Sequence, residues 1–159
     1  MAPGQLVSSL RLFILCTMTC SCAQPRPEEF RASVQAATRN FVDAINRGDS
    51  GAMAALYLHE QRVSTASDGT IAAGWDSVRV VLDEIASGRE GHLHIVLGSV
   101  EAVPLGSQHA LAVTPFALTV ESPTGESKFR GAMTVVLEHA GSKWLIVHDH
   151  ESFVPEHRP

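Results

Sequence analysis

The second half of the chain consists of long strand-like runs joined by short turns. The four runs read HLHIVLGSVEAV, HALAVTPFALTVE, KFRGAMTVVLEHA and KWLIVHDHESF, and they are separated by PLGSQ, SPTGES and GS. Connections this short join antiparallel neighbours, so the pattern predicts one antiparallel sheet made of consecutive strands. Pro115 has no backbone N–H for the ladder and therefore predicts a bulge or a sheet edge at that point.

The first half of the chain has helical periodicity instead. Apolar residues recur at spacings of three and four between residues 30 and 45, and Gly48 offers a left-handed stop. Asp49 can cap a short second helix, GAMAALYL, and the stretch WDSVRVVLDEIASG predicts a third helix that ends at Gly88. The intervening stretch RVSTASDGTIAAG predicts a small hairpin with its turn at residues 67–69.

Three helices followed by a long sheet form an α+β arrangement. The helices and the sheet each have an apolar face, so the sheet must curve over the helices to bury both faces. A curved sheet and a helix layer enclose a cone, and the open end of a cone is a natural pocket for a ligand. The 159 residues, 45% of them hydrophobic, fit one domain with a sizeable core.

The charge of the chain excludes nucleic acid as an expected partner. The formal net charge is −5, and the sequence contains no run of Lys or Arg that could follow a phosphate backbone. The eight His titrate near physiological pH, so the net charge responds to mild acid. This response is a property of the chain and does not by itself indicate a function.

The first residues have the layout of a secretory leader. A charged residue, Arg11, precedes the apolar run Leu12–Leu15, which continues into small residues around Ala23. A positive flank, a short apolar region and small residues at a cleavage point are typical of a signal peptide, and this run is too short to span a bilayer. We therefore expect residues 1–23 to be a leader, residues 24–29 to be a linker, and the product to be exported.

The three cysteines, Cys16, Cys20 and Cys22, all lie inside this leader. Cleavage after Ala23 would leave a periplasmic or secreted chain without cysteine and therefore without a disulfide. In an alternative interpretation of the leader, TCSC followed by Ala23 resembles a bacterial lipoprotein signal. Cys22 would then be the lipidated first residue, and Thr19 stands where Leu is usual. Only this lipid anchor would connect the protein to a membrane. An uncleaved leader is the third alternative.

Three stretches of the sequence, in this order, carry a resemblance to a known family. They are FVDAINRGDSGAMAALY, in which a helix stops at an Asn-x-Gly-Asp turn, SDGTIAAGWDSV, in which a hairpin leads into a helix, and the terminal hairpin RGAMTVVLEHAGSKWLIVHDHES. Together they resemble the SnoaL-like branch of the nuclear transport factor 2-like superfamily, and the last is also similar to the association domain of calcium/calmodulin-dependent protein kinases.

The resemblance covers residues 28–153 and implies a cone-shaped fold with three N-terminal helices packed on a strongly curved antiparallel sheet. It sets the expected domain at residues 30–154, followed by a short tail, residues 155–159. Because this fold hosts isomerases, dehydratases, cyclases, hydrolases and noncatalytic binders, the resemblance does not define the chemistry.

The ketosteroid isomerases of this superfamily provide a test of chemistry. They use a Tyr in the first helix as an oxyanion donor and an Asp in the early hairpin as the base. The matching helix position here is Phe41, and the hairpin offers Ser64, Thr65 and Ala66 where the base would stand. Asp68 lies at the turn, where a bond to the backbone is its commoner role. Steroid-isomerase chemistry is therefore not expected.

The last strand provides the main candidate site. Alternate positions of a strand share a face, so the pattern predicts that Trp144, Ile146, His148, His150 and Ser152 lie together, with Leu145, Val147, Asp149 and Glu151 opposite. Two imidazoles on one face can serve as acid and base, or bind an anion when protonated. In the alternative, this face meets solvent or a dimer partner, and the imidazoles are structural donors.

Three further residues are candidates for ligand binding beside His148, His150 and Ser152. Tyr57 and Trp75 could form aromatic walls with a polar tip, although core packing is the commoner use of both. Arg130 could bind a carboxylate through two hydrogen bonds if it points inward, and it is a solvated charge if it does not. Catalytic residues are not assigned beyond the two candidate His.

Neither a metal nor a cofactor is expected. HLH at residues 92–94 and HDH at residues 148–150 invite a metal hypothesis, but the resemblance places two strands between them, a distance of about 14 Å. A nucleophilic triad is not expected either, because the mature chain has no Cys and no Ser in a GxSxG turn.

The sequence thus predicts an exported SnoaL-like domain that dimerises through its sheet and binds a small, partly apolar molecule, with His148 and His150 at the polar end of the pocket. One alternative is a cofactor-free acid/base enzyme, such as an isomerase or dehydratase, that uses one of these His. The other is a dimeric structural module whose cavity is filled by side chains.

Overall fold

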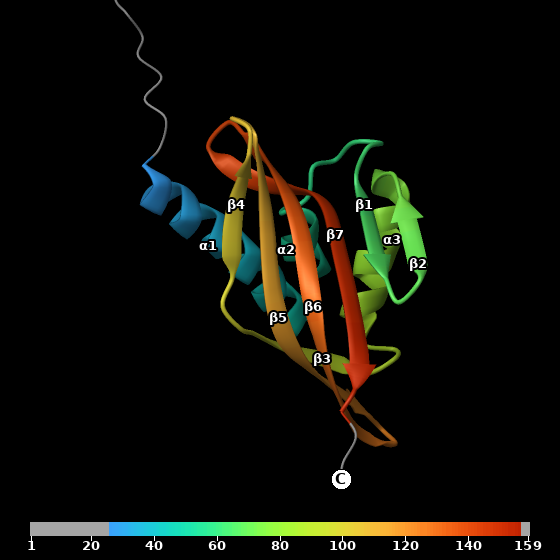
Figure 1. Cartoon of the computed structure of the whole chain (residues 1–159). Helices are drawn as coiled ribbons and strands as arrows, with labels where there is room; N and C mark the ends of the chain where they lie inside the picture. The colour runs from blue at the N-terminus through green and yellow to red at the C-terminus, as the bar shows by residue number, and fades with distance from the viewer. Residues whose placement is uncertain (1–25, 157–159) are drawn as a thin grey trace, which may run out of the picture.

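The computed structural model describes residues 26–156, which form three helices and seven strands (Figure 1). The predicted leader, residues 1–23 with Cys22, lies outside the described residues, as do residues 157–159. The elements are α1 (Pro27–Asn46), α2 (Ser50–Ala54), β1 (Ser64–Ser67), β2 (Thr70–Ala73), α3 (Trp75–Ser87), β3 (His92–Leu97), β4 (Glu101–Leu105), β5 (His109–Ser122), β6 (Gly125–Ala140) and β7 (Lys143–Pro155). No helix between residues 26 and 156 is long and apolar enough to cross a bilayer.

The helices follow the predicted pattern closely. Helix α1 starts at Pro27, inside the expected linker, and buries one stripe that includes Val34, Phe41 and Ile45. The Asp49 side chain accepts a hydrogen bond from the backbone N–H of Ala52 at 2.9 Å, so it caps α2 as expected. Helix α2 is shorter than predicted, because the chain leaves it after Ala54 to run beside β7.

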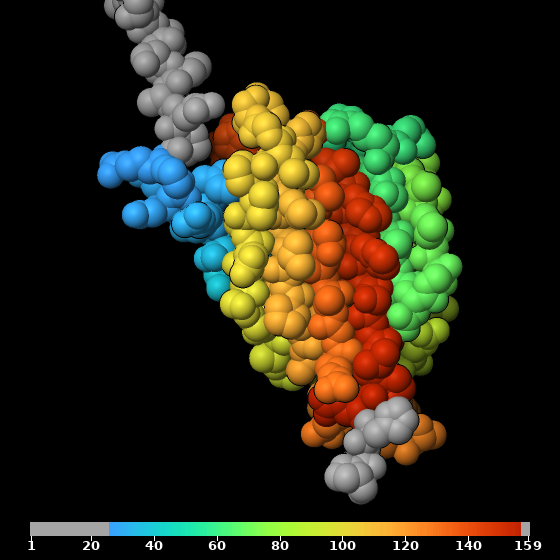
Figure 2. Space-filling model, in the orientation of Figure 1, coloured from blue at the N-terminus to red at the C-terminus, as the bar shows by residue number. Residues whose placement is uncertain are grey.

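The sheet has the strand order β2-β1-β7-β6-β5-β3, and β4 also pairs with β5. All neighbours are antiparallel except β1 and β7, which are parallel. The α+β prediction is confirmed: the helices lie on one face of a curved sheet (Figure 1), and Figure 2 shows the opposite face, continuous from β4 to β1. The core fills the space between the helices and the concave face of the sheet.

The first predicted strand run, HLHIVLGSVEAV, is wrong as a single strand. It breaks at Gly98, and its two parts, β3 and β4, pair with different halves of β5. Pro115 lies on β5 at the change from one partner to the other, and Gly98 N–H donates to the Pro115 carbonyl at 2.8 Å. A Cβ on Gly98 would come within 2.8 Å of the Pro115 ring, so glycine is required at this approach. The irregularity predicted at Pro115 is therefore the point at which β5 changes its pairing partner from β4 to β3.

The pairing of β7 with β6 contains an irregularity that determines which residues face the core. Leu137 pairs with Ile146 and Val136 pairs with His148, so Val147 is an extra residue on β7. On its other edge, β7 bonds to the Leu56–Leu58 segment at Ile146 and pairs with β1 from His148 onward. Val147 therefore lies where β7 changes neighbours.

The bulge at Val147 reverses the predicted faces of β7. Ile146 faces the core with 1% of its surface exposed, and the next inward residue is Asp149, with 2% exposed. Beyond the bulge the inward residues are Asp149, Glu151 and Phe153, while His150 is exposed. The predicted grouping of Ile146 with the imidazoles on one face is therefore wrong, because an extra residue shifts the two-residue period of a strand by one.

Candidate functional site

A cavity of about 560 Å³ lies between the concave face of the sheet and helices α1 and α3. This volume suits a small molecule. Most of its lining is apolar and comes from α1, α3, β3, β5 and β6, and five aromatic side chains take part: Phe41, Tyr57, Phe116, Phe129 and Phe153. The loop after α3 adds Arg89 and Glu90, both exposed, so this loop marks the end of the cavity that is open to solvent.

Asp149 is the polar centre of the cavity. Its carboxylate is held on both oxygens: the Tyr57 hydroxyl donates to Oδ1, and the Thr65 hydroxyl donates to Oδ2 at 2.7 Å. Tyr57 follows α2, Thr65 lies on β1, and both are buried. Burial next to the Asp149 carboxylate raises the pKa of Tyr57 well above its usual value, so this phenol keeps its proton and acts as a donor.

Glu151 lies two residues further along β7 and lines the same cavity. Burial is the main cause that raises the pKa of Glu151 well above its usual value, and the charges of Asp149 and Asp68 add to it. Burial also raises the pKa of Asp149, but the hydrogen bonds from Tyr57 and Thr65 oppose this shift. The two carboxyl groups therefore titrate as a coupled pair, and the hydrogen bonds from Tyr57 and Thr65 favour the charged form on Asp149.

Of the predicted ligand-binding residues, only Tyr57 lines the cavity. The expectation that His148, His150 and Ser152 project into it is wrong, because the bulge at Val147 turns them to the outer face of the sheet. The Nδ1 atom of His148 lies 2.8 Å from the Ser64 hydroxyl on the neighbouring strand.

Trp75 and Arg130 are absent from the lining as well. Trp75 stacks on His59, with ring centroids 3.9 Å apart, and packs against the core. Arg130 pairs across the sheet with Ala117 and Val154, on the face opposite to Phe129. Trp75 therefore packs in the core and Arg130 points away from the cavity, which are the alternatives that the sequence left open for these two residues.

The carboxyl pair, Asp149 and Glu151, was not among the predicted site residues. The sequence HDHES contains both acids at alternate positions, which is enough to place them on one face. Nothing in this local pattern shows which face turns inward, because a bulge depends on the partner strands.

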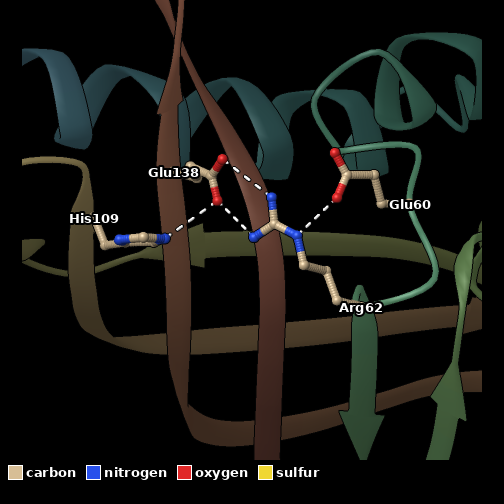
Figure 3. Close-up of polar contacts among 4 residues, drawn as sticks. All are labelled: Glu60, Arg62, His109 and Glu138. Carbon is tan, nitrogen blue, oxygen red and sulfur yellow. Dashed lines mark hydrogen bonds and ion pairs between the residues drawn. The ribbon is translucent and has the colours of Figure 1, made fainter.

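A second polar cluster lies outside the cavity (Figure 3). The Arg62 guanidinium donates to both oxygens of Glu138, at 2.6 and 3.1 Å, and to Glu60 at 2.7 Å, while His109 Nε2 lies 3.1 Å from Glu138. The hydrogen bonds from Arg62 are the main cause that lowers the pKa of Glu138. The cluster joins the segment before β1 to β5 and β6, and its solvent exposure is typical of a structural ion pair.

No metal site is evident between residues 26 and 156, where no three His, Cys, Asp or Glu side chains are grouped suitably for a metal ion. Strands β3 and β7, which bear the two His pairs, have β5 and β6 between them, as the resemblance implied.

Comparisons with known proteins agree on the fold. The family model described as the SnoaL-like domain matches residues 34–156. A candidate dehydratase of the nuclear transport factor 2-like family from Streptomyces avermitilis is 19% identical, with a TM-score of 0.70 over 77% of this chain and 95% of that one. A nuclear transport factor 2-like protein from Salmonella enterica is 13% identical, with a TM-score of 0.72 over 84% and 95% of the two chains.

A candidate association domain of calcium/calmodulin-dependent protein kinase II from Xanthomonas campestris is 20% identical, with a TM-score of 0.67 over 84% of this chain and 94% of that one. No protein with a curated description matches the sequence. These identities are low enough that the similar structures inform the fold alone.

Proposed function

The chain belongs to the SnoaL-like domain family, and on that premise we propose that its cavity binds a small, largely apolar molecule whose polar group reaches Asp149 and Glu151. The observation that supports this most directly is the cavity itself, about 560 Å³ in volume, with a largely apolar wall and the carboxyl pair of Asp149 and Glu151 on β7. Small-molecule sites commonly have this composition, since the apolar wall supplies affinity and the few polar groups fix orientation. A structural module with a filled interior does not account for this volume.

Blocking the cavity tests this proposal. Val120 lines the cavity on β5, so Val120→Trp should fill part of it, whereas Val96→Trp on β3 places the same bulk on a residue that is 55% exposed. A library of small molecules is screened against the wild type by ligand-observed NMR, and each hit is titrated into both variants. We expect Val120→Trp to lose binding and Val96→Trp to retain it. Equal affinities in the two variants would place the ligand elsewhere.

The coupled carboxyl pair favours a second candidate, proton transfer within the cavity. When the pair holds one proton, one carboxyl can remove a proton from a bound molecule while the other donates one, which is the arrangement that isomerases and dehydratases need. Each hit from the screen is incubated with the protein in D₂O, and exchange or conversion is followed by NMR. Catalysis requires that Asp149→Asn and Glu151→Gln abolish the change; a rate that survives both substitutions excludes this pair.

We also propose that the protein is exported, on the basis of the leader-like sequence of residues 1–23. Expression of the full chain followed by fractionation and intact-mass measurement tests it. A mass that corresponds to a start at Gln24 would indicate a signal peptide, and a lipid-modified species lost in Cys22→Ser would indicate a lipoprotein. An intact, unprocessed chain in the cytoplasmic fraction would contradict export.

The outer face of the sheet supports a homodimer. Val103, Leu105 and Val113 lie on β4 and β5 with 38% to 46% of their surfaces exposed, and contiguous exposed apolar side chains commonly mark an interface. The molar mass by light scattering should therefore be that of two chains and should fall to one in Val113→Arg. A wild type that is monomeric at all accessible concentrations would refute this interface.

A further inference from the structure

We propose that the molecule bound in the cavity is an organic cation, an amine protonated at neutral pH on an apolar body, whose ammonium group lies against Asp149 and Glu151 while its apolar part packs among the aromatic rings. This inference rests on the proposed function, because it specifies the ligand class of the same cavity. It concerns the charge of the ligand, which neither the fold nor the family similarity determines.

The first observation is the charge of the cavity. Among the described residues, the ionisable side chains in its lining are four acids, Glu84, Glu90, Asp149 and Glu151, and one base, Arg89. Glu84 and Glu90 are exposed like Arg89, so the acids away from solvent are Asp149 and Glu151. Arg89 is exposed on the loop after α3, where its Nε donates to the Ser87 hydroxyl at 3.2 Å. Its charge therefore lies at the solvent end, so an anionic ligand that reached the interior would meet carboxyl groups there.

The second observation is that the buried carboxylate has no cationic partner. Between residues 26 and 156, neither Asp149 nor Glu151 forms an ion pair with a basic side chain. Both hydrogen bonds to Asp149 come from neutral hydroxyls, those of Tyr57 and Thr65. The charge of His148 acts on Asp149, but the His148 ring pairs with the Ser64 hydroxyl and forms no ion pair with the carboxylate. Burial of an anion is costly unless an opposite charge compensates it, and a bound cation would supply that charge.

The third observation is the arrangement of the aromatic rings around the two acids. Phe41 and Tyr57 pack edge to face, with centroids 5.6 Å apart, beside Asp149. Phe129 and Phe153 form a similar pair, with centroids 5.4 Å apart, and Phe153 follows Glu151 on the inward face of β7. Ring faces attract cations as well as apolar groups, and a desolvated site strengthens this attraction. A carboxyl pair flanked by aromatic rings therefore matches an ammonium group on an apolar body.

A matched set of three probes tests the charge preference without any variant. Naphthylmethylamine, naphthylmethanol and naphthoate share the same apolar body and carry a cation, a neutral hydroxyl and an anion. Isothermal titration calorimetry on the wild type at neutral pH should give an amine affinity about tenfold or more above that of the alcohol, because a charge-assisted hydrogen bond is roughly twice as strong as a neutral one. Naphthoate should bind most weakly.

Variants then show which residues cause the preference for the amine. In the double variant Asp149→Asn with Glu151→Gln, the amine should lose its advantage while naphthylmethanol binds as before, which also reports that the cavity is intact. Glu101→Gln on β4, an exposed acid outside the cavity, is the matched control and should keep the preference.

The outcomes separate this inference from the proposed function. An alcohol that binds as tightly as the amine to the wild type, or an amine preference that survives the double variant, overturns the cationic ligand and leaves the cavity as a binding site. If none of the three probes binds at millimolar concentration, cavity binding itself fails, and the inference fails with it.

Discussion

Replacement of Glu151 by Gln should change how the stability of this protein depends on pH. The pKa of Glu151 is raised well above 4.5 in the folded protein, mainly by burial and then by the neighbouring Asp149. The folded state therefore holds a proton that the unfolded state releases. Between the unfolded pKa and the raised folded pKa, the unfolded chain binds fewer protons, so the free energy of unfolding falls as pH rises.

The size of this effect follows from the proton linkage. One proton corresponds to a slope of at most about 1.4 kcal/mol per pH unit. The stabilising contribution of the protonated carboxyl is fully present below the unfolded pKa and is lost as pH rises through the folded pKa. Gln cannot ionise, and its side chain has nearly the size and shape of the protonated carboxyl. Glu151→Gln should therefore have a flatter pH profile and should be more stable than the wild type above the folded pKa.

Urea denaturation followed by circular dichroism, repeated from mildly acidic to mildly alkaline pH, measures both profiles. Asp149 contributes a slope of the same sign, since its pKa is also raised, so the difference between the two curves reports the contribution of Glu151 to the titration of the coupled pair. Glu101→Gln, on the exposed side of β4, is the control and should follow the wild type. Parallel curves for Glu151→Gln and the wild type, with no gain in stability at high pH, would show that Glu151 is ionised and solvated in the folded state.

Three further predictions concern the neighbourhood of this site. Tyr57→Phe removes the phenol that donates to the buried Asp149 and should lower the free energy of unfolding by about 1–3 kcal/mol in urea denaturation; an unchanged value would mean that another donor replaces it. Gly131→Ala adds a Cβ that meets Phe116 at 2.7 Å and should cost about 1–3 kcal/mol, so a variant of wild-type stability would contradict this packing. His150 lies on the outer face, so His150→Gln should leave the affinity of any cavity ligand, measured by calorimetry, unchanged. A large loss of affinity would instead support the site predicted from the sequence.

Much of the fold could be predicted from the sequence because it depends on local patterns. The ends of the first and third helices follow from Gly48 and Gly88, and the turn of the first hairpin follows from Asp68 and Gly69, which have positive φ. These residues act through their own backbone preferences, so no distant partner is needed. The strand break at Gly98 was missed because it exists only as a change of partner along β5.

The candidate site, in contrast, depends on contacts between distant segments, so little of it could be predicted from the sequence. An aromatic side chain with a polar tip, such as Tyr57, indicates a pocket wall by itself, whereas placing the imidazoles rather than the carboxyls of β7 inward requires unbroken alternation along the strand. The bulge at Val147 breaks this alternation. The phenol and the carboxylate that meet in the cavity, Tyr57 and Asp149, are 92 residues apart in the sequence, so only the folded arrangement brings them together.

The amino-acid sequence by itself determined the order of the elements, the α+β class and the existence of a curved sheet over three helices, because hydrophobic periodicity and turn chemistry are properties of short segments. The tertiary structure alone decided which face of β7 lines the cavity. Strand register is set by the neighbouring strands, and one extra residue at Val147 exchanges the two faces for every position that follows. The cavity is therefore lined by Asp149 and Glu151, and His148 and His150 lie outside it.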